Sequence, residues 1–159
     1  MQRTEDEVTS QEEILDILKK AEACRLALHD EEYPYIVPLN FGIEEKEDLY
    51  LYFHCAHEGK KLDLIHRNNK ACFEVEADTE MVPGDKPCGW SMKFRSVIGE
   101  GSIEIIEDET GIRHGLDVLM EHYAGKGKYQ YDERILKKTF VLRLKVYRLW
   151  AKSHGFKKE

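Results

Sequence analysis

Residues 49–69 read LYLYFHCAHEGKKLDLIHRNN and contain the clearest change of secondary structure along the chain. Leucine, tyrosine and phenylalanine alternate over residues 49–53, a pattern that predicts a β-strand. A tight loop from Cys55 to Gly59 follows, and apolar residues then recur at helical spacing from Lys60 onward. We therefore expect a strand that passes through a short loop into a short helix.

The predicted helix begins with two lysines, Lys60 and Lys61. The first turn of a helix carries free N–H groups and partial positive charge, so cations are unfavourable there unless an anion binds. The pattern leaves two interpretations open, a phosphate-binding loop or a solvated lysine pair on a surface helix. Neither a Walker motif nor a dinucleotide fingerprint occurs in the chain.

Potential metal ligands lie beside this loop, but they do not form a recognisable metal motif. His54 and His57 flank Cys55, and a zinc site needs three or four ligands. No established spacing links this trio to the remaining candidates, which are His66, Cys72 and Cys88. We expect no metal, one histidine lining a polar pocket and the other adding to the phosphate loop. Since no nucleophile elbow or carboxylate pair is recognisable either, an enzyme of this sequence would depend on a cofactor for its reactivity.

The rest of the chain predicts a mainly β protein with flanking helices. Short turns between successive strands favour antiparallel pairing, and a curved sheet of this size tends to close into a small barrel. Pro38 marks a bulge or a free strand edge, and Gly99 and Gly101 mark a bulge or a barrel corner. A polar tail, residues 1–9, precedes a single domain, residues 10–159. We expect six strands, at residues 24–28, 35–43, 49–53, 71–77, 94–106 and 140–151, and helices at residues 11–22, 112–124 and 132–138.

Composition excludes several classes of protein. The 159 residues are 42% hydrophobic and 35% charged, which is a globular composition, and the formal net charge is -7. That charge disfavours nucleic acid as a partner, and no apolar run is long enough for a membrane helix. The four cysteines form no C-x-x-C pair. Because residues 1–8 are polar and acidic, unlike a signal peptide, we expect reduced thiols in a cytoplasmic protein.

Three blocks of the sequence resemble one known family. They are LALHDEEYPYIVPLNF (residues 26–41), YFHCAHEGKKLDL (residues 52–64) and FRSVIGEGSIEII (residues 94–106). Their order and spacing are similar to the nitroimidazole-resistance (Nim) branch of the pyridoxamine 5'-phosphate oxidase-like flavin-binding split barrels. The resemblance runs from about Glu12 to Ala124.

The resemblance implies a six-stranded antiparallel split β-barrel that forms a homodimer, with FMN in two clefts between the subunits. One strand would run along the flavin ring, and the strand–loop–helix unit would hold the phosphate through Lys60, Lys61 and His57. A third block would reach the flavin from the second subunit, and His54 would be the catalytic residue beside the ring. The implied cofactor-binding residues are Val37, Pro38, Leu39, Asn40, Phe41, Phe53, His54, Cys55, Ala56, His57, Lys60, Lys61, Arg95, Ser96 and Val97.

The implied activity is flavin-dependent reduction of a small acceptor, such as a nitroaromatic compound, with NAD(P)H as electron donor and FMN, or alternatively FAD, as cofactor. The C-terminal arginines by which oxidase members bind substrate phosphate do not align here, so vitamin B6 oxidase activity is not expected. The alternative is a non-catalytic flavin- or haem-binding carrier or sensor of the same fold, with His54 or His57 as axial ligand. A structural zinc protein ranks third.

Overall fold

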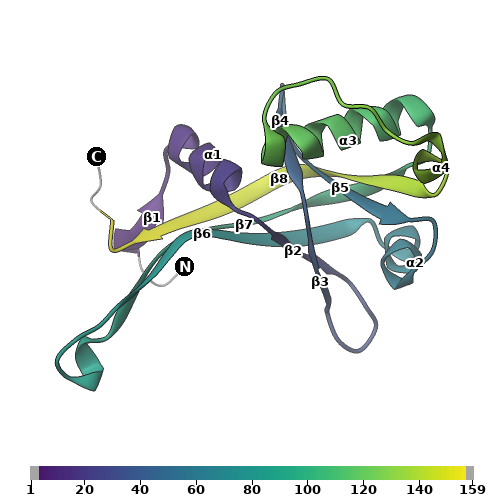
Figure 1. The fold of residues 1–159 in the computed structure, drawn as a ribbon. Coiled ribbons are helices and arrows are strands. Elements are labelled where there is room, and N and C mark those ends of the chain that lie inside the picture. Colours follow the sequence, from purple (N-terminus) through teal and green to yellow (C-terminus); the bar gives the residue numbers. More distant parts are fainter. Residues whose placement is uncertain (1–3, 157–159) are drawn as a thin grey trace.

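The computed structural model describes residues 4–156, which fold as one antiparallel sheet with helices packed around it (Figure 1). The helices are α1 (Gln11–Lys20), α2 (Lys60–Arg67), α3 (Glu109–Ala124) and α4 (Glu133–Leu136), with short 3-10 turns η1 (Thr4–Asp6) and η2 (Pro87–Gly89). The strands are β1 (Glu7–Val8), β2 (Cys24–Leu28), β3 (Tyr35–Leu39), β4 (Gly42–Glu45), β5 (Leu49–Ala56), β6 (Lys70–Val82), β7 (Ser91–Ile106) and β8 (Thr139–His154). No helix within residues 4–156 is long and apolar enough to cross a membrane.

The order of the strands shows why the sheet is a split barrel. Neighbouring strands follow the order β3-β2-β6-β7-β8-β5-β4, with β1 paired to β8. The two ends of this order, β3 and β4, are separated in the chain only by Asn40 and Phe41. Because each residue spans at most about 3.8 Å, the sheet must curl until its two edges approach one another. The predicted antiparallel split barrel is therefore confirmed.

Two predictions about the strands need correction. The single strand expected at residues 35–43 is two strands, since β3 pairs with β2 and β4 pairs with β5 at the opposite edge. The segment expected as a polar tail also contributes a strand, because Glu7–Val8 pairs with Lys152 and Ala151 and the Val8 side chain is buried. A two-residue strand has no periodicity that a sequence pattern could reveal. Residues 1–3 of that predicted tail lie outside the described residues.

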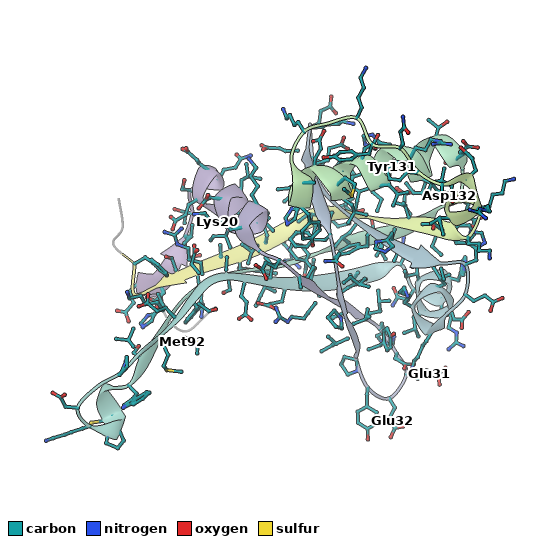
Figure 2. All side chains as sticks on the ribbon, viewed as in Figure 1. Lys20, Glu31, Glu32, Met92, Tyr131 and Asp132 are labelled. Atoms are coloured by element: carbon teal, nitrogen blue, oxygen red, sulfur yellow. The ribbon has the colours of Figure 1, made fainter. Side chains whose placement is uncertain are left out.

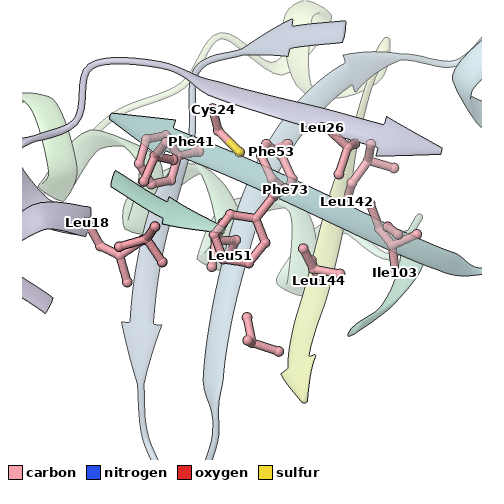
Figure 3. Close-up of a cluster of buried hydrophobic side chains, with 14 of the residues drawn as sticks. Leu18, Cys24, Leu26, Phe41, Leu51, Phe53, Phe73, Ile103, Leu142 and Leu144 are labelled. Carbon is pink, nitrogen blue, oxygen red and sulfur yellow. The ribbon is translucent and has the colours of Figure 1, made fainter. Parts of the chain in front are cut away.

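A single hydrophobic core fills the barrel, and α1 and α2 pack against it. Figure 3 shows part of this core, with side chains from α1, from the link between β3 and β4 and from the strands; they include Leu18, Cys24, Leu26, Phe41, Leu51, Phe53, Phe73, Ile103, Leu142 and Leu144. A second, smaller cluster lies under α3 and α4 and includes Tyr52, Val118, Leu136 and Val141. Alternate residues of β5 thus serve two cores, which explains why this strand gave such a clear alternating pattern.

The register of β7 with β8 shifts between Glu100 and Gly101. A Cβ atom on Gly101 would overlap the backbone carbonyl of Lys145, so the close approach of the two strands requires glycine. Of the two alternatives expected near Gly99 and Gly101, a bulge or a barrel corner, this register shift confirms the bulge.

The side chain of Tyr123, near the end of α3, forms hydrogen bonds with two connecting segments, one between β3 and β4 and one between α1 and β2. Its hydroxyl accepts a hydrogen bond from the Phe41 N–H (3.1 Å) and donates one to the Glu22 carbonyl oxygen (2.8 Å). The His122 imidazole lies 2.8 Å from the Ala21 carbonyl oxygen, and burial lowers the pKa of His122. These contacts hold the link between β3 and β4 in place although no β-ladder joins the two strands in the described chain.

Candidate functional site

The junction of β5 with α2 matches the strand, loop and helix expected from the sequence. β5 ends at Ala56 and α2 begins at Lys60. The N-cap residue is Gly59, whose φ of 141° favours glycine over any residue with a side chain. Glycine offers no side-chain acceptor to the first helical N–H groups. The start of α2 is therefore an open site for an anion.

Lys60 reaches from this start of α2 toward the loop between β2 and β3. Its Nζ lies 2.6 Å from Asp30 Oδ2 and 5.4 Å from the centre of the Tyr35 ring. The hydrogen bond from Lys60 lowers the pKa of Asp30 below its usual value. Asp30 thus occupies the position at which an incoming phosphate would bind Lys60, so the two anions would compete for this lysine.

Lys61 is half-buried in the first turn of α2, close to Cys55. Burial raises the pKa of the Cys55 thiol, although the charge of Lys61 opposes this shift. A buried thiol with a raised pKa is not an activated nucleophile. Lys61 is therefore available to an anion, whereas Cys55 contributes packing.

The strand β3 forms one edge of the sheet, and its outer side has no strand partner within residues 4–156. The free edge explains how Pro38, which has no N–H to donate, is tolerated in a strand, and it confirms one of the two expectations for this proline. Because Tyr35 contacts Lys60, this edge begins beside the start of α2. It then continues for about 17 Å to Asn40, at about 3.3 Å per residue. Two lysines at the start of a helix and a free backbone edge of this length suit a flat ligand with an anionic tail.

The predicted site residues on β3 divide between two sides of the strand. Val37 and Leu39 pack against the core, whereas Pro38 and Asn40 are exposed. Ile36, which was not predicted, is also exposed (62%). Phe41 lies beyond the strand and is completely buried. Only the exposed residues of this segment can offer side chains to a ligand.

Several other predicted site residues also have buried side chains. Phe53, Cys55 and Val97 belong to the barrel core together with Phe41. Any contact that these four residues make with a ligand must therefore come from the backbone.

Of the two predicted histidines, His54 lies on the side of β5 that faces away from the barrel core, and His57 lies just beyond the end of β5. His54 is exposed, two residues before the end of the strand, and Ala56 is exposed beside the loop. His57 stacks on Phe140, with ring centres 3.9 Å apart. It lines a small pocket of about 180 Å³ whose charged residues are three glutamates and one lysine, namely Glu107, Glu109, Glu133 and Lys137. This acidic surrounding disfavours a phosphate at His57, so the anion site rests on the two lysines.

No group of three His, Cys, Asp or Glu side chains that could hold a metal is found within the described residues. Cys24 and Cys55 are buried and Cys72 and Cys88 are exposed, and all four are free thiols.

The third predicted block, Arg95 to Val97, lies far from the lysines in the same chain. Arg95 pairs with Ser153 on β8, whereas Ala56 pairs with Thr139 on that strand. The stretch of β8 between these partners measures about 45 Å at about 3.3 Å per residue. One ligand cannot contact both blocks of a single chain.

Arg95 has partners of its own, and Ser96 lies half-buried beside it. The Arg95 guanidinium lies 3.4 Å from carboxylate oxygens of both Asp16 and Asp78 and packs over the ring of Phe156 at 4.6 Å. Its Nε atom is buried without a hydrogen-bond partner. Arg95 therefore connects α1 to the β6–β7 hairpin in this chain.

Sequence analysis missed two residues of the site, Asp30 and Tyr35. The run Asp30 to Glu32 predicts a turn, and Figure 2 shows Glu31 and Glu32 at the tip of this loop. The pairing of Asp30 with Lys60 depends on the packing of α2 against β2, which no local pattern shows. A cavity of about 930 Å³ is lined by this same loop, including Asp30, and by residues such as Ala27, Cys72, Ser102 and Tyr147.

Comparison with known proteins agrees with this architecture. The family model described as pyridoxamine 5'-phosphate oxidase matches residues 10–153. A solved structure named as a candidate 5-nitroimidazole antibiotic resistance protein, from Bacteroides thetaiotaomicron VPI-5482, is 32% identical with a TM-score of 0.79. The match covers 92% of this chain and 86% of that chain. No curated protein sequence matches.

Two more distant structures share the fold. The flavocytochrome Anf3 from Azotobacter vinelandii has a TM-score of 0.80 at 18% identity, covering 100% of this chain and 75% of that chain. The FAD and heme binding protein from Mycobacterium smegmatis has a TM-score of 0.78 at 22% identity, covering 97% of this chain and 76% of that chain.

Proposed function

Because this chain belongs to the pyridoxamine 5'-phosphate oxidase family, within which it is similar to a nitroimidazole-resistance protein, we propose that it is an FMN-dependent oxidoreductase. One observation carries the proposal. The paired lysines of α2 and the free edge of β3 lie side by side, joined by the contact of Lys60 with Tyr35. Similar structures named as FAD-binding proteins support a flavin at such a site.

In the proposed complex, Lys60, Lys61 and the first N–H groups of α2 bind the phosphate of FMN. The N–H groups carry partial positive charge and each ammonium group adds a charge-assisted hydrogen bond. The backbone of β3 from Val37 to Asn40 offers its unpaired edge to the polar rim of the flavin ring. These contacts fix the position and orientation of the ring.

When bound, the flavin would supply the redox chemistry, accepting two electrons as hydride from NAD(P)H and passing two electrons to a small nitroaromatic acceptor that takes its protons from the surroundings. The exposed His54 is proposed to exchange one of these protons through its imidazole. We propose a homodimer, because one chain supplies only one wall of the cleft. The four free cysteines are compatible with a reducing, cytoplasmic location.

The absorption spectrum of the purified protein tests the cofactor. We expect flavin bands, or their appearance when FMN is added, and loss of these bands when NAD(P)H is added without oxygen. A nitroaromatic acceptor should then restore the bands. A colourless protein that takes up neither FMN nor FAD would refute the proposal. A flavin that binds but is not reduced, or a sharp haem band lost in His54→Ala or His57→Ala, would favour the carrier instead.

A further inference from the structure

The cavity of about 930 Å³ lies on the outer face of the sheet, opposite the barrel core. Its floor is a row of residues on three neighbouring strands, because Ala27 of β2 pairs with Cys72 of β6 and Cys72 pairs with Glu100 of β7. Cys72 is exposed, whereas its neighbours Ala71 and Phe73 are buried in the core. Small-molecule sites occupy about 300–1,000 Å³. The small side chains of Ala27 and Cys72 thus leave room for a ligand of that size.

One wall of the cavity is the side chain of Tyr147, which the bulge in β8 places there. While β7 advances from Glu100 to Gly101, β8 advances by two residues, so Tyr147 is the extra residue of the bulge. Its side chain is 62% exposed, and its hydroxyl shares a hydrogen bond of 2.7 Å with Ser102 Oγ. Bulges are frequent next to functional sites, where they redirect a side chain. The bulge and the hydrogen bond together hold an accessible aromatic ring at the cavity.

The opposite wall is the loop between β2 and β3, which projects from the sheet beside α2 (Figure 1). Two ion pairs join this loop to α2. Asp30 pairs with Lys60 at the start of the helix, and Glu31 lies 3.9 Å from Arg67 at its end. Since Asp30 and Glu31 also line the cavity, the cavity adjoins the lysine that is proposed to bind the flavin phosphate.

The charged residues of the cavity favour a neutral ligand. Four acidic residues line it, namely Asp30, Glu31, Glu32 and Glu100, against one lysine, Lys70. Cations outside the cavity pair with three of these carboxylates. A phosphate inside the cavity would therefore meet mainly acidic groups, whereas carboxylates readily accept hydrogen bonds from ribose hydroxyls.

We propose that this cavity binds an adenosine group. The inference rests on the proposed function, because a phosphate at Lys60 places the end of a nucleotide tail beside the cavity. Adenine would stack on Tyr147, and the amides of Asn68 and Asn69, which also line the cavity, suit the polar edge of the base. Two ligands of the proposed reaction carry adenosine beyond a phosphate, FAD as cofactor and NADH as electron donor. The acidic lining disfavours the additional 2'-phosphate of NADPH.

Comparison of FAD with FMN by titration calorimetry tests the first source. FMN is the matched ligand, because it carries the phosphate but no adenosine. If the adenosine is that of FAD, the wild-type protein should bind FAD more tightly than FMN. Tyr147→Ala should then weaken FAD binding by about fivefold to a hundredfold and leave FMN binding unchanged. Tyr147→Phe keeps the ring and should retain most of the affinity for FAD.

Steady-state kinetics of the protein loaded with FMN test the second source. If the adenosine is that of NADH, Tyr147→Ala should raise the KM for NADH by a similar factor with kcat unchanged, and adenosine should compete with NADH. The KM for NADPH should exceed that for NADH in the wild-type protein. Equal binding of the two flavins together with an unchanged KM for NADH in Tyr147→Ala would overturn the proposal.

Equilibrium dialysis with labelled adenosine separates failure of this proposal from failure of the proposed function. Adenosine should bind about fivefold or more weakly to Tyr147→Ala than to the wild-type protein, whether or not a flavin is bound. The melting temperature should stay nearly unchanged, since Tyr147 is exposed. A protein that binds adenosine in this way but takes up neither flavin would refute the proposed function alone. FMN binding without any dependence of adenosine, FAD or NADH on Tyr147 would overturn the adenosine site alone.

Discussion

Removal of the paired lysines provides the most direct test of the anion site. A charge-assisted hydrogen bond contributes about 1.5–3 kcal/mol, and about 1.4 kcal/mol corresponds to a tenfold change in affinity. Lys61→Ala should therefore weaken FMN binding by about tenfold to a hundredfold. Lys60→Ala should have a smaller effect, because Lys60 must first leave or share Asp30, its partner at 2.6 Å. The double variant should lose about two orders of magnitude or more.

Riboflavin, which lacks the phosphate, is the matched ligand for this experiment. Quenching of flavin fluorescence measures the affinity for both ligands. The double variant should bind riboflavin almost as well as the wild-type protein does, because the edge of β3 is unchanged. Equal losses for the two ligands would show that the lysines maintain the structure, and unchanged FMN affinity would show that the phosphate binds elsewhere.

Asp30→Asn tests the same reasoning with the opposite sign. Asp30 is a charged carboxylate at neutral pH, and the hydrogen bond from Lys60 lowers its pKa further, so Asp30 competes with phosphate for Lys60. Its removal should strengthen FMN binding by about twofold to fivefold at low salt, as expected for an exposed ion pair, and the gain should fade as salt is raised. Weaker FMN binding in Asp30→Asn would refute the idea of competition.

Three further predictions concern the structure that supports the site. Tyr123→Phe removes the hydroxyl that binds the backbone of both Phe41 and Glu22 and should lower the free energy of unfolding, measured in urea, by about 1–3 kcal/mol. The exposed control Tyr33→Phe should have little effect, and equal effects of the two variants would contradict this role of Tyr123. Gly101→Ala should lower the melting temperature by at least about 5 °C and Gly127→Ala by far less, because of these two positions only Gly101 has backbone atoms where the Cβ atom would lie. A Gly101→Ala protein as stable as the wild type would argue against the bulge. Burial raises the pKa of Glu44, but hydrogen bonds from Lys46, His114 and Tyr52 outweigh burial, so the pKa of Glu44 is lowered in the folded protein. The stabilisation by Glu44 is therefore complete above its unfolded pKa of about 4.3 and is lost as the pH falls through the lower folded value. The difference in stability between wild type and Glu44→Gln should shrink below about pH 4, and a constant difference would contradict this hydrogen-bond network.

The elements with strong local signals were predicted well from sequence. The predicted strand at residues 24–28 has the observed bounds of β2. The sequence Ser-Gln-Glu-Glu at residues 10–13 is typical of a helix N-terminus, and Ser10 indeed caps α1 by accepting a hydrogen bond from the N–H of Glu13. Longer strands were predicted too short. For β6 the alternation of buried and exposed residues ends near Ala77, where the β6–β7 hairpin leaves the barrel and neither face is buried.

The candidate site was only partly accessible from sequence. The two lysines are adjacent in the chain and start a helix, so their placement followed from local rules. The partner carboxylate Asp30 and the separation of Arg95 from the lysines depend on strand order and register. Neither leaves a periodic or motif signal in the amino-acid sequence.

The sequence by itself determined the antiparallel strands, the helix starts and the cationic turn at Lys60 and Lys61, because backbone dihedral preferences and the burial of alternate side chains act over a few residues. Only the tertiary structure decided that β3 and β4 take opposite edges of one sheet, that Asp30 meets Lys60, and that the β6–β7 hairpin with Trp90 stands clear of the barrel. These features depend on which distant segments pair, and that choice is made by the free energy of packing the whole core rather than by any local stretch of the chain.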